Sequence, residues 1–212
     1  MKIILSMAIS LHINELDISM EKTNVRKQQY IQGIQQLVYI LKGYSKYNIQ
    51  FQISDNTTDI LDKDIMDVLP TNTIVTCFKN NQYGKLNKGA GLLEVWQHNL
   101  NLFKEYDYII HFEPRTLLIS DTFFSSFFSN PRTLFTLGDK SGKLKSHVYT
   151  GLFAIESTLL QKYTENVHPE YLCEKKISIE DCLGEFVEKY SDRIPYVDVL
   201  WKFATHTYFI RF

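Results

Sequence analysis

Short apolar runs alternate along the first half of the chain with segments whose apolar residues recur at three- and four-residue intervals. The apolar runs cover residues 3–11, 49–53, 73–78 and 108–112. The helical spacing covers residues 30–41 and 92–103. Short apolar runs are typical of strands, and the longer interval is typical of amphipathic helices. Their alternation predicts an α/β fold with a mostly parallel, twisted sheet flanked by helices.

The second half of the chain continues this pattern with longer polar loops. Strands are expected at 134–137 and 148–155, and a short helix at 159–163. A last helix is expected after Ser178, with a buried stripe that extends to Tyr190. No repeat, low-complexity segment or linker interrupts the sequence, so we expect a single domain over residues 1–212.

Composition limits the function classes. A chain of 212 residues with a net charge of -1 can bury a full core, and it argues against a broad nucleic-acid-binding surface. Cys77, Cys173 and Cys182 show neither metal-ligand spacing nor a disulfide framework. Three unclustered thiols therefore favour a reducing, cytoplasmic compartment.

The apolar N-terminal run superficially resembles a signal peptide. It is short, polar residues follow it from His12 onward, and no small-residue cleavage site is evident, so we interpret it as the first strand. No run in the sequence is long enough to cross a bilayer, and peripheral contact with a membrane is left open.

The strand at 108–112 carries the most informative turn in the sequence. Pro114 cannot donate to a β-ladder, so the strand should stop just before it. Glu113 and Arg115 would then stand at the carboxyl edge of the sheet, where open α/β folds bind ligands. The alternative is a solvated turn that carries an ordinary ion pair.

Two further loops follow predicted strands. Asp55, at the end of the second strand, could bond a nucleobase or ribose, or it could cap a turn. The segment 84–91 combines three glycines with Lys85 and Lys88 just before a helix, which suits a phosphate group. This segment matches neither a Walker loop nor a dinucleotide fingerprint.

An acidic pair opens the last predicted helix. Ser178 and Asp181 have the spacing of a capping-box variant, which is a complete structural explanation. The functional alternative makes Glu180 or Asp181 a general base in a cleft.

The order of these features resembles nucleotide-sugar-dependent glycosyltransferases with the A-type (GT-A) fold. The matching features are a strand ending in Asp-Asn, an Asn-x-Gly helix start, a Tyr-Asp-Tyr-Ile-Ile strand, a Thr-Gly-x-Phe-Ala strand and a Glu-Asp pair. The resemblance spans roughly residues 1–183 and looks closest to the inverting branch of polysaccharide and lipopolysaccharide synthesis. It implies a Rossmann-like sheet, a nucleotide-binding half at 1–118 and an acceptor-side half at 119–212.

The resemblance also implies roles for individual residues. The nucleoside would be held by Ala8, Ser10 and Asp55. The nucleoside or diphosphate would lie against Asn87, Lys88 and Gly89. The donor sugar and acceptor would be bordered by Thr150 and Gly151. One member of the pair Glu180 and Asp181 would deprotonate the acceptor hydroxyl, and the family position favours Asp181.

The turn Glu113-Pro114-Arg115 departs from the family pattern, which has Asp-x-Asp binding a manganese or magnesium ion there. A hard divalent ion prefers several oxygen ligands, and here only Glu113, with His206 at most, would supply any. Arginine is itself a bidentate phosphate partner. We therefore expect Arg115 to neutralise the departing diphosphate in place of a metal.

The sequence thus predicts a hexosyltransferase, inverting by resemblance, that moves a sugar from a nucleotide diphosphate sugar to a hydroxyl of a glycan or glycolipid. The alternative is a catalytically inactive relative that binds a nucleotide or glycan as a regulatory or scaffolding module. A nucleotidyltransferase is disfavoured because no glycine-rich basic loop follows the first strand directly.

Overall fold

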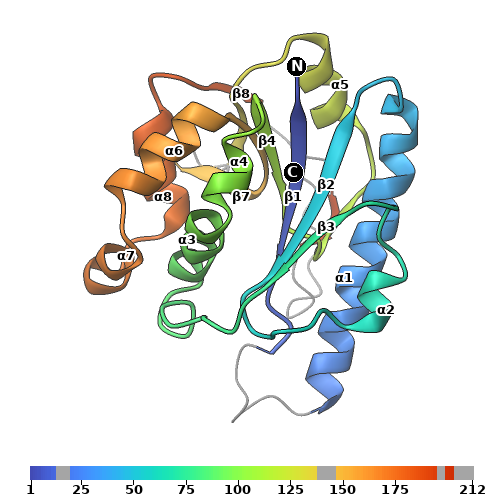
Figure 1. The fold of residues 1–212 in the computed structure, drawn as a ribbon. Helices are drawn as coiled ribbons and strands as arrows, with labels where there is room; N and C mark the ends of the chain where they lie inside the picture. Colours follow the sequence, from blue (N-terminus) through green and yellow to red (C-terminus); the bar gives the residue numbers. More distant parts are fainter. Residues whose placement is uncertain (13–19, 138–146, 195–198, 203–212) are drawn as a thin grey trace.

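A seven-stranded sheet forms the centre of the protein (Figure 1). The computed structural model describes residues 1–12, 20–137, 147–194 and 199–202. The strand order is β3-β2-β1-β4-β7-β6-β8, and β5 pairs with β9 in a separate two-stranded sheet. The strands are β1 (Ile3–Ile9), β2 (Ile49–Asp55), β3 (Ile74–Cys77), β4 (Tyr108–Phe112), β5 (Thr116–Leu118), β6 (Leu134–Leu137), β7 (Val148–Glu156), β8 (Asp192–Ile194) and β9 (Val199–Lys202).

The first four strands of the sheet run in parallel. Strand β1 pairs with both β2 and β4, and β2 pairs with β3. Strand β7 is antiparallel to both β4 and β6, whereas β6 and β8 are parallel. The carboxyl ends of β3, β2, β1 and β4 therefore lie at one edge of the sheet. This arrangement confirms the predicted α/β fold with a mostly parallel central sheet.

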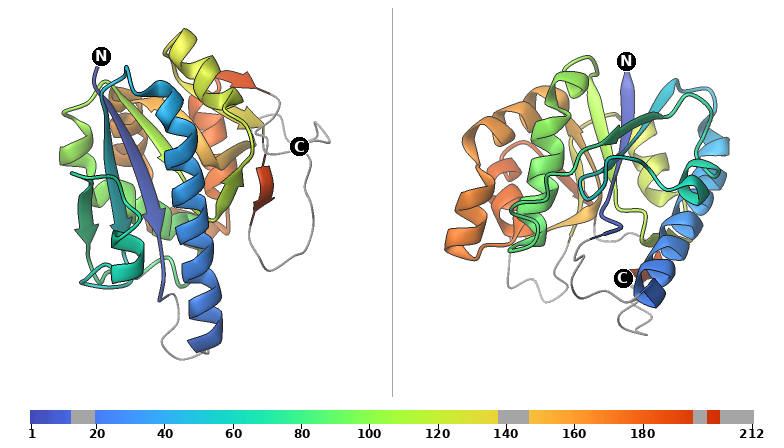
Figure 2. Two further views of the ribbon diagram at one scale, coloured as in Figure 1. Left: turned by 90° about the vertical axis from the view of Figure 1, so that its right-hand side faces the viewer. Right: turned by 60° about the horizontal axis from the view of Figure 1, so that its bottom comes forward.

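Helices cover both faces of the sheet (Figures 1 and 2). They are α1 (Met20–Leu41), α2 (Lys63–Met66), α3 (Lys88–His98), α4 (Leu100–Phe103), α5 (Thr122–Ser129), α6 (Ser157–Asn166), α7 (Pro169–Lys175) and α8 (Ile179–Val187), with a 3-10 turn at Lys42–Tyr44. Helix α1 lies on one face, and α3, α6 and α8 lie on the other. Within the described ranges, no helix combines the length and apolar character needed to cross a membrane.

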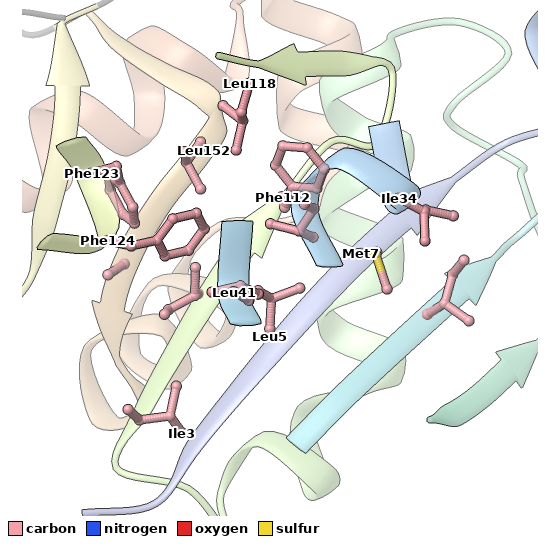
Figure 3. Packing of buried hydrophobic residues seen from close by; sticks show 14 of the residues in the cluster. Ile3, Leu5, Met7, Ile34, Leu41, Phe112, Leu118, Phe123, Phe124 and Leu152 are labelled. Atoms are coloured by element: carbon pink, nitrogen blue, oxygen red, sulfur yellow. The ribbon is translucent and has the colours of Figure 1, made fainter. Parts of the chain in front are cut away.

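Side-chain alternation along β1 divides the core into two layers. Leu5 and Met7 pack toward Ile34 of α1 (Figure 3). Ile4 faces the opposite way, into a cluster that contains Trp96 of α3. This division follows from the period of two in a strand.

The helix expected over 92–103 is interrupted at Asn99. The buried Asn99 amide donates to the Val95 carbonyl and to Ser54 Oγ, each at 2.8 Å. A side chain that bonds the preceding turn competes with continuation of the helix. Helix α3 therefore ends at His98, and α4 begins at Leu100.

Other helices also differ from the sequence prediction. Helix α1 already begins at Met20 rather than near Tyr30. Helix α8 ends at Val187, so Tyr190 is not part of a buried stripe and is 63% exposed. The phenylalanine-rich α5 and the proline-initiated α7 were not assigned from sequence.

Candidate active site

A cleft of about 420 Å³ opens beside the carboxyl ends of β1 and β4. The loop before α3, the start of α3 and the start of α8 form its other walls. The predicted site residues that line it are Ala8, Ser10, Asn87, Lys88, Gly89, Glu113, Arg115, Thr150 and Glu180. Asp55, Gly151 and Asp181 are not among its lining residues, and His206 lies outside the described part of the chain.

An arginine–glutamate pair stands at the end of β4. The Nε and Nη2 groups of Arg115 donate to the same oxygen of Glu113, at 3.2 and 2.9 Å. The Arg115 side chain is only 11% exposed. Burial acts to lower the pKa of Arg115, but Tyr30 and Glu113 outweigh it and the pKa is raised. The cleft therefore contains a permanently charged, positioned cation.

Helix α1 fixes the neighbouring end of β1. Arg26 Nη1 donates to the Ser10 carbonyl at 2.9 Å, and the Tyr30 hydroxyl accepts from the Ser10 amide at 3.1 Å. The Arg115 guanidinium lies 6.0 Å from the centre of the Tyr30 ring. Burial, and then the charge of Arg115, act to lower the pKa of Arg26. Two guanidinium groups thus lie near the single carboxylate of Glu113.

Sequence analysis did not identify Arg26 or Tyr30 as part of this region. Tyr30 was recognised only as one residue of an apolar helical stripe. Its position beside Ser10 depends on how α1 crosses the sheet edge, which no local pattern encodes.

Asn87 is the N-cap of α3, and both polar atoms of its side chain form hydrogen bonds within the protein. Its Oδ1 accepts from the amides of Gly89 and Ala90, at 2.9 and 3.3 Å. Its Nδ2 donates to the carbonyls of Leu172 and Ile177, at 3.1 and 3.0 Å. Asn87 therefore joins α3 to the α7 region, and Lys88 supplies the charged group at this helix start.

Helix α8 approaches α3 closely at Gly89. A Cβ atom on Gly89 would lie 2.7 Å from Ile179 Cβ, so a larger residue would displace one of the helices. This packing brings Glu180 into the cleft, where Thr150 Oγ1 donates to Glu180 Oε1 at 2.8 Å.

Asp181 has different partners from its neighbour. Its amide donates to Ser178 Oγ at 3.1 Å, its Oδ2 accepts from the same hydroxyl at 2.6 Å, and its Oδ1 lies 2.7 Å from His147 Nδ1. Burial acts to raise the pKa of Asp181, but hydrogen bonds from Ser178 and His147 outweigh it and the pKa is lowered. The structure thus supports the capping interpretation for Asp181, and Glu180 is the member of the pair that lines the cleft.

Asp55 is buried beneath the sheet edge rather than in the cleft. Its carboxylate accepts from the amides of Leu11 and Thr57, at 3.3 and 2.8 Å, and from Thr57 Oγ1. Burial raises the pKa of Asp55. These bonds join the chain after β1 to the chain after β2, as the turn-capping alternative expects. Gly151 likewise acts through its backbone, because its carbonyl accepts from the Glu113 amide at 2.8 Å.

His111 of β4 lines the cleft although sequence analysis did not single it out. The signal was available, since a histidine inside a buried apolar strand is unusual. The ring is 1% exposed, and burial lowers its pKa to about 3, so it is neutral.

The described residues do not fit a divalent metal. Within the described ranges, no three His, Cys, Asp or Glu side chains gather to hold an ion. Glu113 is already bonded to Arg115, and Glu180 is bonded to Thr150.

Comparison with solved structures shows similarity in fold. The chain resembles a putative nucleotide-diphospho-sugar transferase from Desulfovibrio desulfuricans G20, with 9% identity, a TM-score of 0.55, and coverage of 95% of this chain and 84% of that one. It also resembles the galactosyltransferase LgtC, solved with donor and acceptor sugar analogs, with 12% identity, a TM-score of 0.53, and coverage of 90% and 72%.

A third similar structure is a putative glucose-1-phosphate thymidylyltransferase from Bacillus anthracis in complex with a sucrose. It has 12% identity, a TM-score of 0.53, and coverage of 91% of this chain and 86% of that one. No protein-family model and no curated protein sequence matches the chain. At these identities the similarities establish the fold alone.

Proposed function

We propose that the protein is a glycosyltransferase that moves a hexose from a nucleoside diphosphate sugar to a hydroxyl group of a glycan or glycolipid. The observation that carries the proposal is that a buried cation, Arg115, and a held carboxylate, Glu180, line one cleft. Two of the structures with a similar fold are named for nucleotide-diphospho-sugar transfer and galactosyl transfer, which supports this chemistry.

The diphosphate of the donor is assigned to the cationic side of the cleft. Arg115 is positioned by Glu113, and Lys88 stands at the first position of α3. A guanidinium in a partly buried site forms strong bonds to phosphate oxygens, and a helix start favours negative charge. Arg26 adds to the positive potential from behind Ser10.

The reaction is a single displacement. Glu180 accepts the proton of the acceptor hydroxyl, whose oxygen forms a bond to the anomeric carbon of the donor. The bond between that carbon and the diphosphate oxygen breaks, and its electron pair leaves with the nucleoside diphosphate, whose charge Arg115 stabilises. One displacement inverts the configuration at the anomeric carbon.

Glu180 replaces Asp181 as the proposed base. Family position favours Asp181, but its carboxylate is bonded to Ser178 and His147 and is not among the groups that line the cleft. The pKa of Asp181 is lowered, which makes it a weaker proton acceptor than an unperturbed carboxylate.

We place the acceptor in polysaccharide or lipopolysaccharide synthesis and the reaction in the cytoplasm. Both assignments rest on the resemblance and on the thiol composition, and they are part of the same proposal.

A binding module without turnover is the second candidate. The observation that favours it is the Glu113–Arg115 bond at the position where the family has two metal-binding carboxylates. This second candidate binds a nucleotide or a glycan, and only the first candidate requires turnover.

The decisive experiment combines a binding screen with a turnover assay. The protein is screened by thermal shift against nucleoside diphosphates and their sugars, and a ligand at 100 times its dissociation constant should add about 2.7 kcal/mol of stability. Release of nucleoside diphosphate is then measured in the presence of glycan and glycolipid acceptors. Absence of any nucleotide-dependent shift at millimolar concentration would refute the proposal.

Variants on α8 then test the base. Glu180→Gln should lower turnover by about 100- to 10,000-fold while donor binding is kept. Glu185→Gln, an exposed position on the same helix, is the matched control and should keep full activity. Binding of a nucleotide sugar without turnover on any acceptor would favour the binding module.

A further inference from the structure

His111 occupies the inner end of the cleft. In the parallel register His111 lies beside Ser6, so Ala8 and Glu113 are each one side-chain step further toward the mouth on their own strands. One step is two residues, or about 6.6 Å along a strand. His111 therefore lies deeper in the cleft than the Glu113–Arg115 pair.

The ring of His111 is held by two aromatic neighbours. The Trp96 ring meets it edge-on, with centroids 5.5 Å apart, and the Phe153 ring lies 5.2 Å away. Trp96 Nε1 donates to His111 Nδ1 at 3.5 Å. Trp96 is 1% exposed, and a buried indole N–H needs an acceptor.

This contact fixes the tautomer of the imidazole. A neutral ring has one protonated nitrogen, and Nδ1 acts here as an acceptor. The proton therefore resides on Nε2, the nitrogen on the opposite side of the ring from Cγ. Because His111 lines the cleft, that N–H is the hydrogen-bond donor that the ring can offer to a ligand.

The surroundings of His111 select a neutral ligand group. Ala8, on the neighbouring strand, and Val95, on the facing helix, are uncharged cleft residues, and Glu113, one step from His111 on its own strand, is an anion. The cations Lys88 and Arg115 stand at the first position of α3 and in the turn after β4. A phosphate placed at the inner end would lose its water without gaining a cation, which is costly. A sugar hydroxyl carries no charge and needs only hydrogen-bond partners.

We propose that His111 Nε2–H donates a hydrogen bond to a hydroxyl of the donor hexose and thereby helps to select the sugar. The proposal rests on the proposed glycosyltransferase function and deepens it, because it assigns the sugar to the inner end of the cleft and the diphosphate to the cationic rim.

Two variants of His111 test the contact. His111→Phe keeps an aromatic ring between Trp96 and Phe153 but removes the donor. His111→Gln places an amide N–H near the position of Nε2. The probes are the nucleotide sugar that most stabilises the wild-type protein and the nucleoside diphosphate of the same base, with affinities measured by calorimetry. His98→Phe, at an exposed position of α3, is the control.

We expect His111→Phe to weaken binding of the nucleotide sugar about 3- to 10-fold, the effect of one neutral hydrogen bond. Binding of the nucleoside diphosphate should stay within twofold, and His111→Gln should recover part of the loss. Should His111→Phe fail to fold, His111→Leu is the second variant without a donor.

Other results would overturn the inference. Equal weakening of both probes would place the contact on the nucleotide instead of the sugar. Unchanged affinity for both probes would make His111 a packing residue. A wild-type protein that binds neither class of probe would refute the proposed function itself, and the inference with it.

Discussion

Gly33 in the middle of α1 lies directly against Pro114. A Cβ atom on Gly33 would stand 1.7 Å from the Pro114 carbonyl oxygen and 3.1 Å from that of Thr116. The absence of a side chain at Gly33 lets α1 cross over the turn that carries Glu113 and Arg115. The position of the Glu113–Arg115 pair thus depends on a helix that begins nearly a hundred residues earlier in the chain.

Gly33→Ala should destabilise the protein although alanine is the better helix former. The added methyl group meets backbone, which cannot move without displacing the turn, and we expect a cost of about 1–3 kcal/mol. Gly43→Ala is the matched control, because nothing lies within 4 Å of a Cβ there. Denaturant unfolding measures both. Equal stability of the two variants would contradict the close approach.

Arg115→Ala should weaken binding of a nucleoside diphosphate about 10- to 100-fold, because a charge-assisted bond to phosphate is worth about 1.5–3 kcal/mol. Arg132→Ala is the control, since Arg132 pairs with Asp192 and is not among the residues that line the cleft. Calorimetry is run with manganese and with a chelator. If the chelator abolishes binding to the wild type and Arg115→Ala has no effect, a divalent metal ion rather than Arg115 binds the diphosphate.

Asp181→Asn should reduce stability more than turnover. The lowered pKa of Asp181 means that its ionised form contributes stability above the unfolded pKa of about 3.9. That contribution is lost as the pH falls through the folded pKa. The stability difference between wild type and variant should therefore stay nearly constant from pH 7 to about pH 5 and shrink as the pH falls below about 4. A turnover loss confined to Asp181→Asn, with Glu180→Gln active, would reverse the assignment of the base.

Asn87→Asp should destabilise α3 although aspartate is a good N-cap in general. The carboxylate keeps the acceptors for Gly89 and Ala90 but loses the two donors that bond the carbonyls of Leu172 and Ile177. The Leu172 carbonyl keeps the Ile177 amide as a donor, so the loss falls on the Ile177 carbonyl, and a carbonyl left without a donor costs about 1–3 kcal/mol. Melting temperatures of Asn87→Asp and Asn87→Ser test this. Wild-type stability in Asn87→Asp would show that capping alone matters.

The buried His111 should make the protein acid-sensitive. Its folded pKa is about 3 and its unfolded pKa about 6.5, so below pH 6.5 the unfolded state binds a proton that the folded state excludes. Stability therefore falls as the pH drops, by about 2 kcal/mol from pH 7 to pH 5. The His111→Gln variant should not show this loss of stability at low pH. The His98→Gln variant, changed at an exposed histidine, should still show it. Parallel pH profiles for wild type and His111→Gln would contradict the prediction.

Local patterns in the sequence determined most of the central sheet. Strands β4 and β6 have the predicted bounds, because an apolar run and a proline act on the backbone within a few residues. The cap at Ser178 and the end of β4 before Pro114 could also be predicted, because each depends on residues within three positions in the sequence. The helix break at Asn99 was not predicted, because the Asn99 amide that bonds the Val95 carbonyl is also bonded to Ser54 of β2, a contact between segments distant in the sequence.

Only the tertiary structure decided which groups face the cleft. Glu180 and Asp181 are adjacent in sequence and have the same chemistry, and neighbours on a helix point about 100° apart. Which of them enters the cleft depends on how α8 packs against α3 at Gly89 and Ile179. Sequence reveals the residue types and the helix period, whereas the orientation of a helix about its axis is set by contacts with distant segments.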